Sequence, residues 1–282
     1  QVGTAELLLA RGLLLEAEDH AIQAIEVFDE LGDRHGLSLS LPVWAGSLRL
    51  QGRFSQALGV LNSAIPMFRQ LEVPGLYVRV LLAQAWCEVE IARLGRAQEC
   101  IDELAATVGR GEHLILRLQS HLVWGRILLA SGLLYEASGV LTEVCTKASN
   151  AGLVVLSEHA RSLLAETLWN AGEKDQAKLH FDQARTRLAT AGDVPALMSA
   201  CCATGRAMAE ETRPDKLFAP VASFLSSQPA EVVRLQWTIA QARYLEARGR
   251  GSRKVFEDAS RMLSTMAEDL DATDRTALLM HP

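Results

Sequence analysis

The stretch from Ser157 to Asp193, SEHARSLLAETLWNAGEKDQAKLHFDQARTRLATAGD, decides the fold of this chain. Its first half places apolar residues at helical spacing and ends at Asn170-Ala171-Gly172, with glycine at the usual stop position. Its second half carries another apolar helical face and ends at the break Ala191-Gly192-Asp193. We therefore predict a helical hairpin with a short turn.

The same pattern returns every forty residues along the chain. At one position of each unit the side chain is a hydrogen or a methyl group, and twelve residues later it is almost always alanine. The first column is Ala5, Ala45, Ala85, Gly125, Ala165 and Gly205; the second is Ala17, Ala57, Ala97, Ala137 and Ala177, with Leu217 as the exception. Such a period predicts an α-solenoid in which each unit buries its face against the next. We expect the small residues where paired helices cross most closely, at about 8–10 Å.

The turn between the two helices of a unit also carries the same kind of residue in successive units. It holds Gly12, Gly52, Gly132 and Gly172, and Ala92 replaces glycine in the third unit. The third unit departs once more, because Glu88 stands where other units have leucine or methionine.

Together these columns resemble the tetratricopeptide repeat. Leu164-Ala165, Leu168, Gly172, Ala177, Phe181 and Ala184 match that motif in order and spacing, as do the units around Trp44-Ala45 and Trp124-Gly125. The usual period is about 34 residues, whereas the longer period of this chain is similar to the repeats of MalT-type transcription activators and related bacterial signalling ATPases and kinases. The resemblance implies a right-handed superhelix of about seven helix-turn-helix repeats, used as a sensor or docking domain of a longer protein.

The chain is predicted to be one all-α array over residues 1–282, regular over 1–225 and irregular over 226–282. We expect the residues in excess of the usual repeat to lie between units, as in Phe28-Asp29-Glu30-Leu31-Gly32-Asp33. Thr212 is expected to cap a helix that Pro220 kinks near its beginning. Gln1 begins inside a helical pattern, and residues 277–280 stop as another begins, so we expect a part of a longer chain.

Composition and motifs exclude several classes of function. The net charge of −6 gives no support for direct nucleic-acid binding, and no apolar run approaches the ~18 residues of a membrane span. The five cysteines are odd in number and form no CxxC pair, which favours reduced thiols in a cytoplasmic protein. No catalytic or nucleotide-binding motif is present, and no histidine pair has metal-ligand spacing. We therefore expect no enzyme, no cofactor and no metal.

The first helices of such hairpins are expected to line a concave groove, and the repeat position tells which residues face it. The predicted binding residues are Arg49, Arg79, Trp86, Gln119, Arg126, His159, Ser162, Glu166, Trp169, Asn170 and Arg206. Arginine and tryptophan dominate recognition surfaces because they offer a fixed fork of donors or a large contact area. The alternative is that these residues are solvated helix faces with one or two packed indoles.

The tryptophans divide by their place in the repeat. Trp44 and Trp124 precede the small column and are predicted to belong to the core. Of the two predicted groove indoles, the sequence favours Trp169 over Trp86, because Gln84 and Glu88 break the pattern of the third unit.

The favoured hypothesis is a non-catalytic interaction or sensor domain that binds a peptide, a partner domain or a small effector in its groove. A second hypothesis is a spacer or self-association scaffold within the parent chain. A third is the effector-binding domain of a MalT-like regulator, with a sugar or peptide inducer as ligand.

Overall fold

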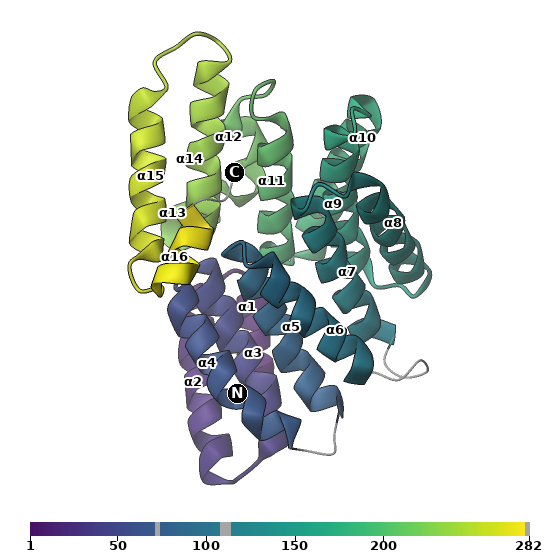
Figure 1. Ribbon diagram of the computed structural model, residues 1–282, viewed down its shortest axis with the longest axis vertical. Coiled ribbons are helices and arrows are strands. Elements are labelled where there is room, and N and C mark those ends of the chain that lie inside the picture. Colours follow the sequence, from purple (N-terminus) through teal and green to yellow (C-terminus); the bar gives the residue numbers. More distant parts are fainter. Residues whose placement is uncertain (71–73, 108–113, 280–282) are drawn as a thin grey trace.

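The computed structural model describes residues 1–70, 74–107 and 114–279, and over these residues the chain is all-helical, without a strand (Figure 1). The helices are α1 (Val2–Ala10), α2 (Leu14–Glu30), α3 (Arg34–Leu50), α4 (Phe54–Arg69), α5 (Pro74–Glu90), α6 (Leu94–Thr107), α7 (Leu114–Ala130), α8 (Leu134–Asn150), α9 (Val154–Asn170), α10 (Lys174–Ala191), α11 (Val194–Met208), α12 (Pro214–Leu217), α13 (Ala222–Ser227), α14 (Glu231–Glu246), α15 (Arg253–Ala267) and α16 (Ala272–Leu279). Consecutive helices pack against each other, so the predicted all-α array of hairpins is confirmed.

Helix length explains the forty-residue period. Helices α2, α3, α7, α8 and α9 each have 17 residues, and three-residue turns separate α2 from α3 and α8 from α9. The residues in excess of the usual repeat therefore lengthen the helices, and the prediction that they lie between units was wrong. Phe28, Asp29 and Glu30, for example, belong to α2. Only Leu31, Gly32 and Asp33 form the turn that follows.

The predicted turn positions adopt the left-handed conformation. Gly12, Gly52, Gly132 and Gly172 have φ between 74° and 91°, and Ala92 takes the same region with φ 63°. Gly12 has a second reason to be glycine, because a Cβ there would lie 2.6 Å from Cγ1 of Val194. The turn between α1 and α2 thus touches the beginning of α11.

The small column lies at the helix crossings, as predicted. Ala5, Ala45, Ala85 and Ala165 are fully buried. A Cβ added at Gly125 would lie 2.6 Å from Cδ2 of Leu141 on the partner helix, closer than real contacts allow. The second column is equally buried, at Ala17, Ala57, Ala97, Ala137 and Ala177.

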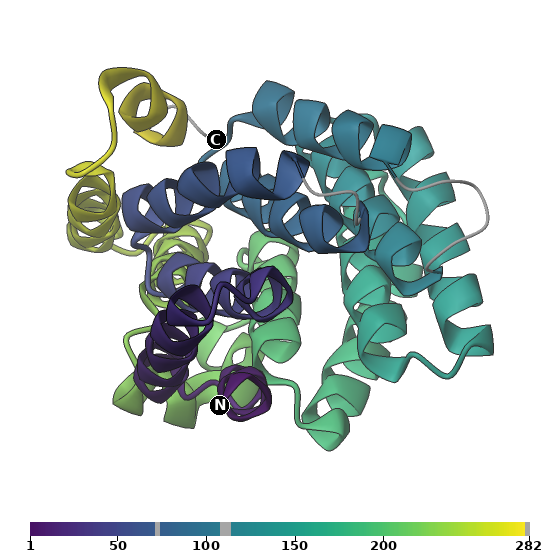
Figure 2. The ribbon, with the colours of Figure 1, turned by 90° about the horizontal axis from the view of Figure 1, so that it is seen from below.

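The first helices of the hairpins form the inner wall of the array. Helix α3 packs on α5, α5 on α7, α7 on α9, α9 on α11, and α11 on α14. The second helices α4, α6, α8 and α10 lie outside them. Figure 2 shows the hairpins following one another around the molecule, so that the purple N-terminal helices and the green and yellow C-terminal helices come together.

Contacts between the two ends close the array. The amide of Leu14 donates a buried hydrogen bond of 3.0 Å to Oε1 of Gln228, 214 residues away. Leu14 and Leu50 share an apolar cluster with Leu197 and Val221, and α14 also touches α3. Ala267, Leu270 and, from α16, Leu278 belong to the same apolar cluster as residues of α4, α5 and α6.

An ionic contact accompanies this closure and explains the departure at Glu88. Arg93 lies 2.9 Å from the carboxylate of Asp274 and 3.4 Å from that of Glu88. Burial raises the pKa of both carboxyl groups, and the charge of Arg93 opposes that rise. The acid that interrupts the leucine column therefore belongs to a contact between the third unit and the last helix.

The sixth unit is irregular, and its second half is broken. Pro220 lies in a 3-10 turn at Ala219–Val221 that separates the short helices α12 and α13, so the expected single kinked helix is replaced by two pieces. The predicted cap was wrong, because the residue before α12 is Arg213 and no side chain caps that end. Proline has no amide hydrogen and starts α12 without loss.

The remaining fold predictions hold in part. All five cysteines are free and buried. Trp44 and Trp124 pack against the core but keep part of their surface exposed, so the prediction that they are core residues is only partly right. Within the described residues, no helix combines the length and the apolar character needed to cross a bilayer.

A substitution pair in α8 tests the close crossing. Ala137→Leu should overpack the hairpin and lower the free energy of unfolding by about 1–3 kcal/mol. Gly139→Ala on the exposed face of the same helix meets no neighbour and should raise it by up to ~1 kcal/mol. Urea denaturation followed by circular dichroism measures both changes. An Ala137→Leu variant as stable as the wild type would contradict the crossing.

Candidate functional site

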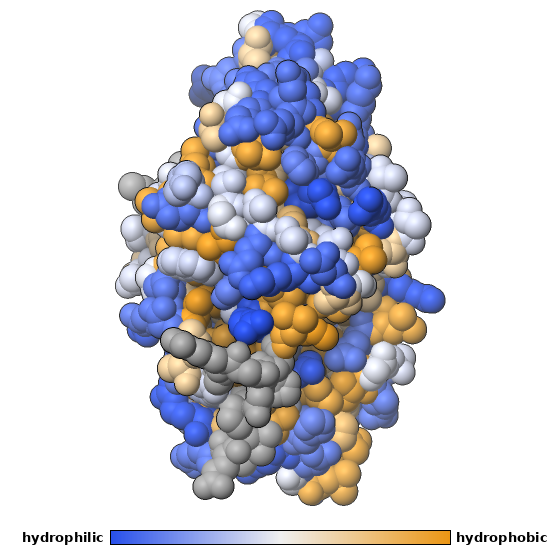
Figure 3. Space-filling model, turned by 90° about the vertical axis from the view of Figure 1, so that its right-hand side faces the viewer, coloured by the Kyte–Doolittle hydropathy of each residue, from blue (hydrophilic) through white to orange (hydrophobic). Residues whose placement is uncertain are grey.

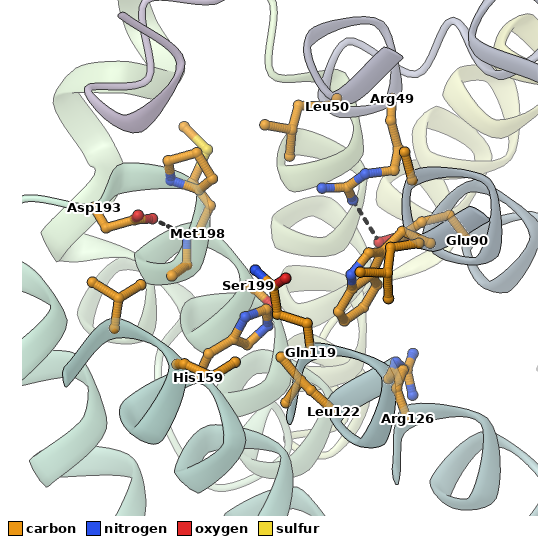
Figure 4. Close-up of a pocket in the computed structure, with 18 of the residues that line it drawn as sticks. Arg49, Leu50, Glu90, Gln119, Leu122, Arg126, His159, Asp193, Met198 and Ser199 are labelled. Carbon is orange, nitrogen blue, oxygen red and sulfur yellow. Dashed lines mark hydrogen bonds and ion pairs between the residues drawn. The ribbon is translucent and has the colours of Figure 1, made fainter. Parts of the chain in front are cut away.

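The inner helices enclose a cavity of about 640 Å³ (Figure 4). Its wall comes from α3, α5, α7, α9, α11 and α14, that is, from the first helix of six successive units. Arg79, Ile115 and Val154 are exposed at its edge, so the cavity is open to solvent there. Helix α14 contacts α3, and α11 contacts α1. Because of these contacts, the predicted groove is closed into a pocket.

The structure brings seven of the eleven predicted binding residues into this wall. They are Arg49, Arg79, Trp86, Gln119, Arg126, His159 and Arg206. The other four, Ser162, Glu166, Trp169 and Asn170, do not line it. Of the predicted residues, a ligand in the cavity could therefore touch the seven that line it.

Each of the four has a different surrounding. Ser162 is buried and donates to the carbonyl oxygen of His159 at 2.7 Å. Glu166 is buried behind Arg206. Trp169 lies on the last turn of α9, and Asn170 is the exposed final residue of that helix.

The preference for Trp169 over Trp86 was wrong as regards the cavity. The ammonium groups of Lys174 and Lys178 on α10 lie 4.8 Å and 5.6 Å from the centre of the Trp169 ring. Those cation–π contacts engage the indole outside the cavity. Trp86 lines the cavity despite the departures at Gln84 and Glu88, because those two residues point to other partners.

Arg49 carries its own counter-ion in the cavity wall. Its Nη1 lies 3.0 Å from Oε1 of Glu90, which was not among the predicted binding residues. The guanidinium also lies 5.9 Å from the ring centre of Trp86. The charge of Arg49 is therefore compensated within the protein.

Arg206 is likewise paired. It donates to both carboxylate oxygens of Glu166, at 2.6 Å and 2.8 Å, in the two-pronged geometry that favours arginine. Burial alone would raise the pKa of Glu166, but the Arg206 charge and hydrogen bonds hold it below its usual value. Burial opposes the charge of Arg206 too, and Glu166 more than offsets that, raising the pKa of Arg206.

Arg126 is different, because it has no partner among the described residues. Its side chain is half-buried in the cavity wall and forms no hydrogen bond or ion pair there. Figure 4 shows it beside Leu122 and Gln119 with no dashed line reaching it. Burial lowers the pKa of Arg126, and the neighbouring charge of Arg206 lowers it further. A desolvated charge without a counter-ion is costly.

Trp86 and His159 meet across the cavity from α5 and α9. Their rings are stacked at 5.6 Å between centres and 11° between planes. Nε2 of His159 lies 2.9 Å from the hydroxyl of Ser199. Burial, with a smaller effect of Arg49, lowers the pKa of His159 to about 4, so the ring is neutral at pH 7.

The repeat itself contained a signal for two of these pairs. Ser199 follows His159 by forty residues, and Arg206 follows Glu166 by the same number. Equivalent positions of successive inner helices are neighbours, so polar residues one period apart could have been paired from the sequence. Glu90, 41 residues after Arg49, lies close to the same rule.

The cavity wall combines charged and apolar side chains. Four arginines and two acids, Glu90 and Asp193, line it, although the whole chain carries a net charge of −6. Asp193 serves the fold by accepting the amide of Ala196 at the start of α11. Within the described part of the chain, no three His, Cys, Asp or Glu side chains gather as a metal site would need.

Comparison with known proteins adds no relative: no family model matches this chain, and no curated protein shows significant similarity to it. Its function is therefore inferred from the cavity.

Two arginine substitutions separate the paired from the unpaired charge. Arg206→Gln leaves Glu166 buried without its partner and should lower the free energy of unfolding by on the order of 3 kcal/mol. Arg126→Gln removes an uncompensated charge and should cost no stability. Urea denaturation at pH 7 compares the two variants. Equal losses would show that Arg126 has a structural role.

His159 should make stability depend on pH. Its pKa is about 4 in the folded chain and 6.5 when unperturbed, so the unfolded state binds more protons between these values and stability rises with pH there. From pH 7 to pH 5 this group should remove about 2 kcal/mol. His159→Gln keeps a hydrogen-bonding side chain and should lose correspondingly less. Urea denaturation of both proteins at the two pH values isolates the effect from that of His121 and His180, and equal losses would contradict it.

Proposed function

We propose that this chain is a non-catalytic sensor or interaction domain that binds a ligand in its inner cavity. The observation that carries the proposal is Arg126, a half-buried arginine that has no partner among the described residues and lies on the wall of a cavity of about 640 Å³. Pockets of roughly 300–1,000 Å³ with apolar walls and few polar groups are typical of small-molecule sites. A bound anion would supply the counter-ion that the protein lacks.

The fold supports a setting for this activity. The forty-residue period, the buried small column and the left-handed turns agree with a tetratricopeptide-like, right-handed superhelix of about seven repeats, of the longer MalT type. In that setting the chain would be a cytoplasmic domain of a larger bacterial signalling or regulatory protein. Ligand binding would then be passed on to other domains or to a protein partner.

Closure of the array favours a small effector over a long peptide. An extended peptide would need an open groove along the inner helices. Here the bond from Leu14 to Gln228 and the contacts of α14 with α3 and of α11 with α1 bring the two ends of that groove together. A small molecule, or the end of a chain, fits the remaining volume.

Self-association is the second candidate function, and exposed apolar side chains favour it. Leu7, Leu31 and Tyr135 are 53%, 73% and 90% exposed. On the face shown in Figure 3, however, apolar residues form several groups with polar residues between them. Sedimentation velocity over a hundredfold range of concentration would detect a dimer.

A cavity-filling variant tests the proposed function. Small metabolites are screened by thermal shift, and hits are measured by titration calorimetry and by quenching of Trp86, with Trp86→Phe identifying its signal. Ala83→Trp places an indole in the cavity and should abolish binding of every hit. Ala189→Trp on the exposed face of α10 is the matched control and should bind normally. Binding that survives Ala83→Trp would place the ligand elsewhere.

A further inference from the structure

We propose that the ligand of this cavity is a small organic monoanion, a carboxylate with an apolar body, whose carboxylate pairs with Arg126. The inference rests on the proposed function, since it assumes that the cavity is the binding site.

Most of the arginines in the cavity wall have a counter-ion or lie at its edge. Of the four arginines in the wall, Arg49 is compensated by Glu90 and Arg206 by Glu166. Arg126 is the half-buried one without a partner among the described residues, and Arg79 lies at the exposed edge. The second acid of the wall, Asp193, accepts the amide of Ala196 at the start of α11. Among the described residues the interior thus offers one arginine without a counter-ion, which suits one negative charge on the ligand.

The shape of the Arg126 guanidinium suits a carboxylate. A guanidinium presents a planar fork of donors that fits a carboxylate with two parallel hydrogen bonds. Arg126 stands on the inner face of α7, two turns after Gln119, and both side chains line the cavity. A carboxylate at Arg126 would therefore lie against the α7 wall.

The rest of the cavity wall is mostly apolar. Beside Trp86, the wall is made largely of aliphatic and methionine side chains, among them Leu50, Leu82, Leu122, Leu156, Met198 and Val233. Apart from ring nitrogens, its neutral polar side chains are Gln119, Gln236 and Ser199, and Ser199 already bonds His159. A sugar needs many neutral hydrogen-bonding partners, so this wall favours an apolar body over a carbohydrate.

The interior of the cavity does not suit a polyanion. His159, the remaining basic side chain of the interior, is neutral at pH 7 because burial lowers its pKa to about 4. It therefore adds no positive charge beside Arg126. A nucleotide or another ligand with several phosphates would bring more negative charge than the interior can compensate.

The experiment uses two probes of the same shape, 1-naphthaleneacetate and its neutral amide, 1-naphthaleneacetamide. Titration calorimetry at pH 7 should show the acid binding about tenfold or more tightly than the amide, as a charge-assisted hydrogen-bond pair implies. Arg126→Gln should bring the acid to the affinity of the amide and leave the amide unchanged. Arg126→Lys keeps the charge and should keep part of the preference.

Controls separate the failure of this inference from that of the proposed function. Arg253→Gln removes an exposed arginine on α15 and should leave both affinities unchanged. Equal affinity for the two probes in the wild type, with both lost in Ala83→Trp, would overturn the anion while the cavity remains the site. Binding of both probes that persists in Ala83→Trp, or no binding of either, would overturn the cavity as their site and the inference with it. A preference for the acid that survives Arg126→Gln would also overturn it.

Discussion

The close crossing of the two helices in each hairpin is the constraint on which the rest of the structure depends. It admits only a hydrogen or a methyl group at Ala5, Ala45, Ala85, Gly125 and Ala165, which are all buried. Because the crossing recurs every forty residues, every inner helix meets its neighbours at the same height. Side chains at equivalent positions are therefore brought together, as His159 and Ser199 are. The forty-residue spacing of the small residues therefore determines which side chains of the inner helices line the cavity.

A second constraint turns an arc of hairpins into an enclosure. The amide of Leu14 would lack a partner at the beginning of α2, and Gln228 supplies one from the other end of the chain. Arg93 and Asp274 form a further contact between a middle unit and the last helix. These contacts are few beside the packing of successive hairpins. The enclosure is thus the part of the fold that can change with the least loss of packing.

The sequence predicted the hairpins, the turns and the small columns because these are local features, each determined within one unit. It also predicted that Arg49, Trp86 and Arg126 face inward, since helical periodicity and the repeat position suffice for that. It could not predict the closure, because the curvature of an array is a sum of small rotations that no single residue determines. The isolation of Arg126 was equally hidden. It depends on which arginines form ion pairs with Glu90 and Glu166. Glu90 pairs with Arg49, and Glu166 pairs with Arg206.

These two ion pairs leave Arg126 without one among the described residues, and its presence in the wall needs a physical reason. A carboxylate on a neighbouring inner helix could have compensated Arg126, as Glu166 compensates Arg206 one period later. Alternatively, a leucine at this position would have packed against Leu122 without any charge to desolvate. The chain has neither among its described residues, and it keeps a side chain whose burial lowers its pKa, an effect that the more distant charges of Glu166 and Glu90 oppose without forming an ion pair with it. Within a folded protein, such an uncompensated group marks a site where stability is given up for another interaction. Under the proposed function, the interaction that would restore the balance in this cavity is a bound anion.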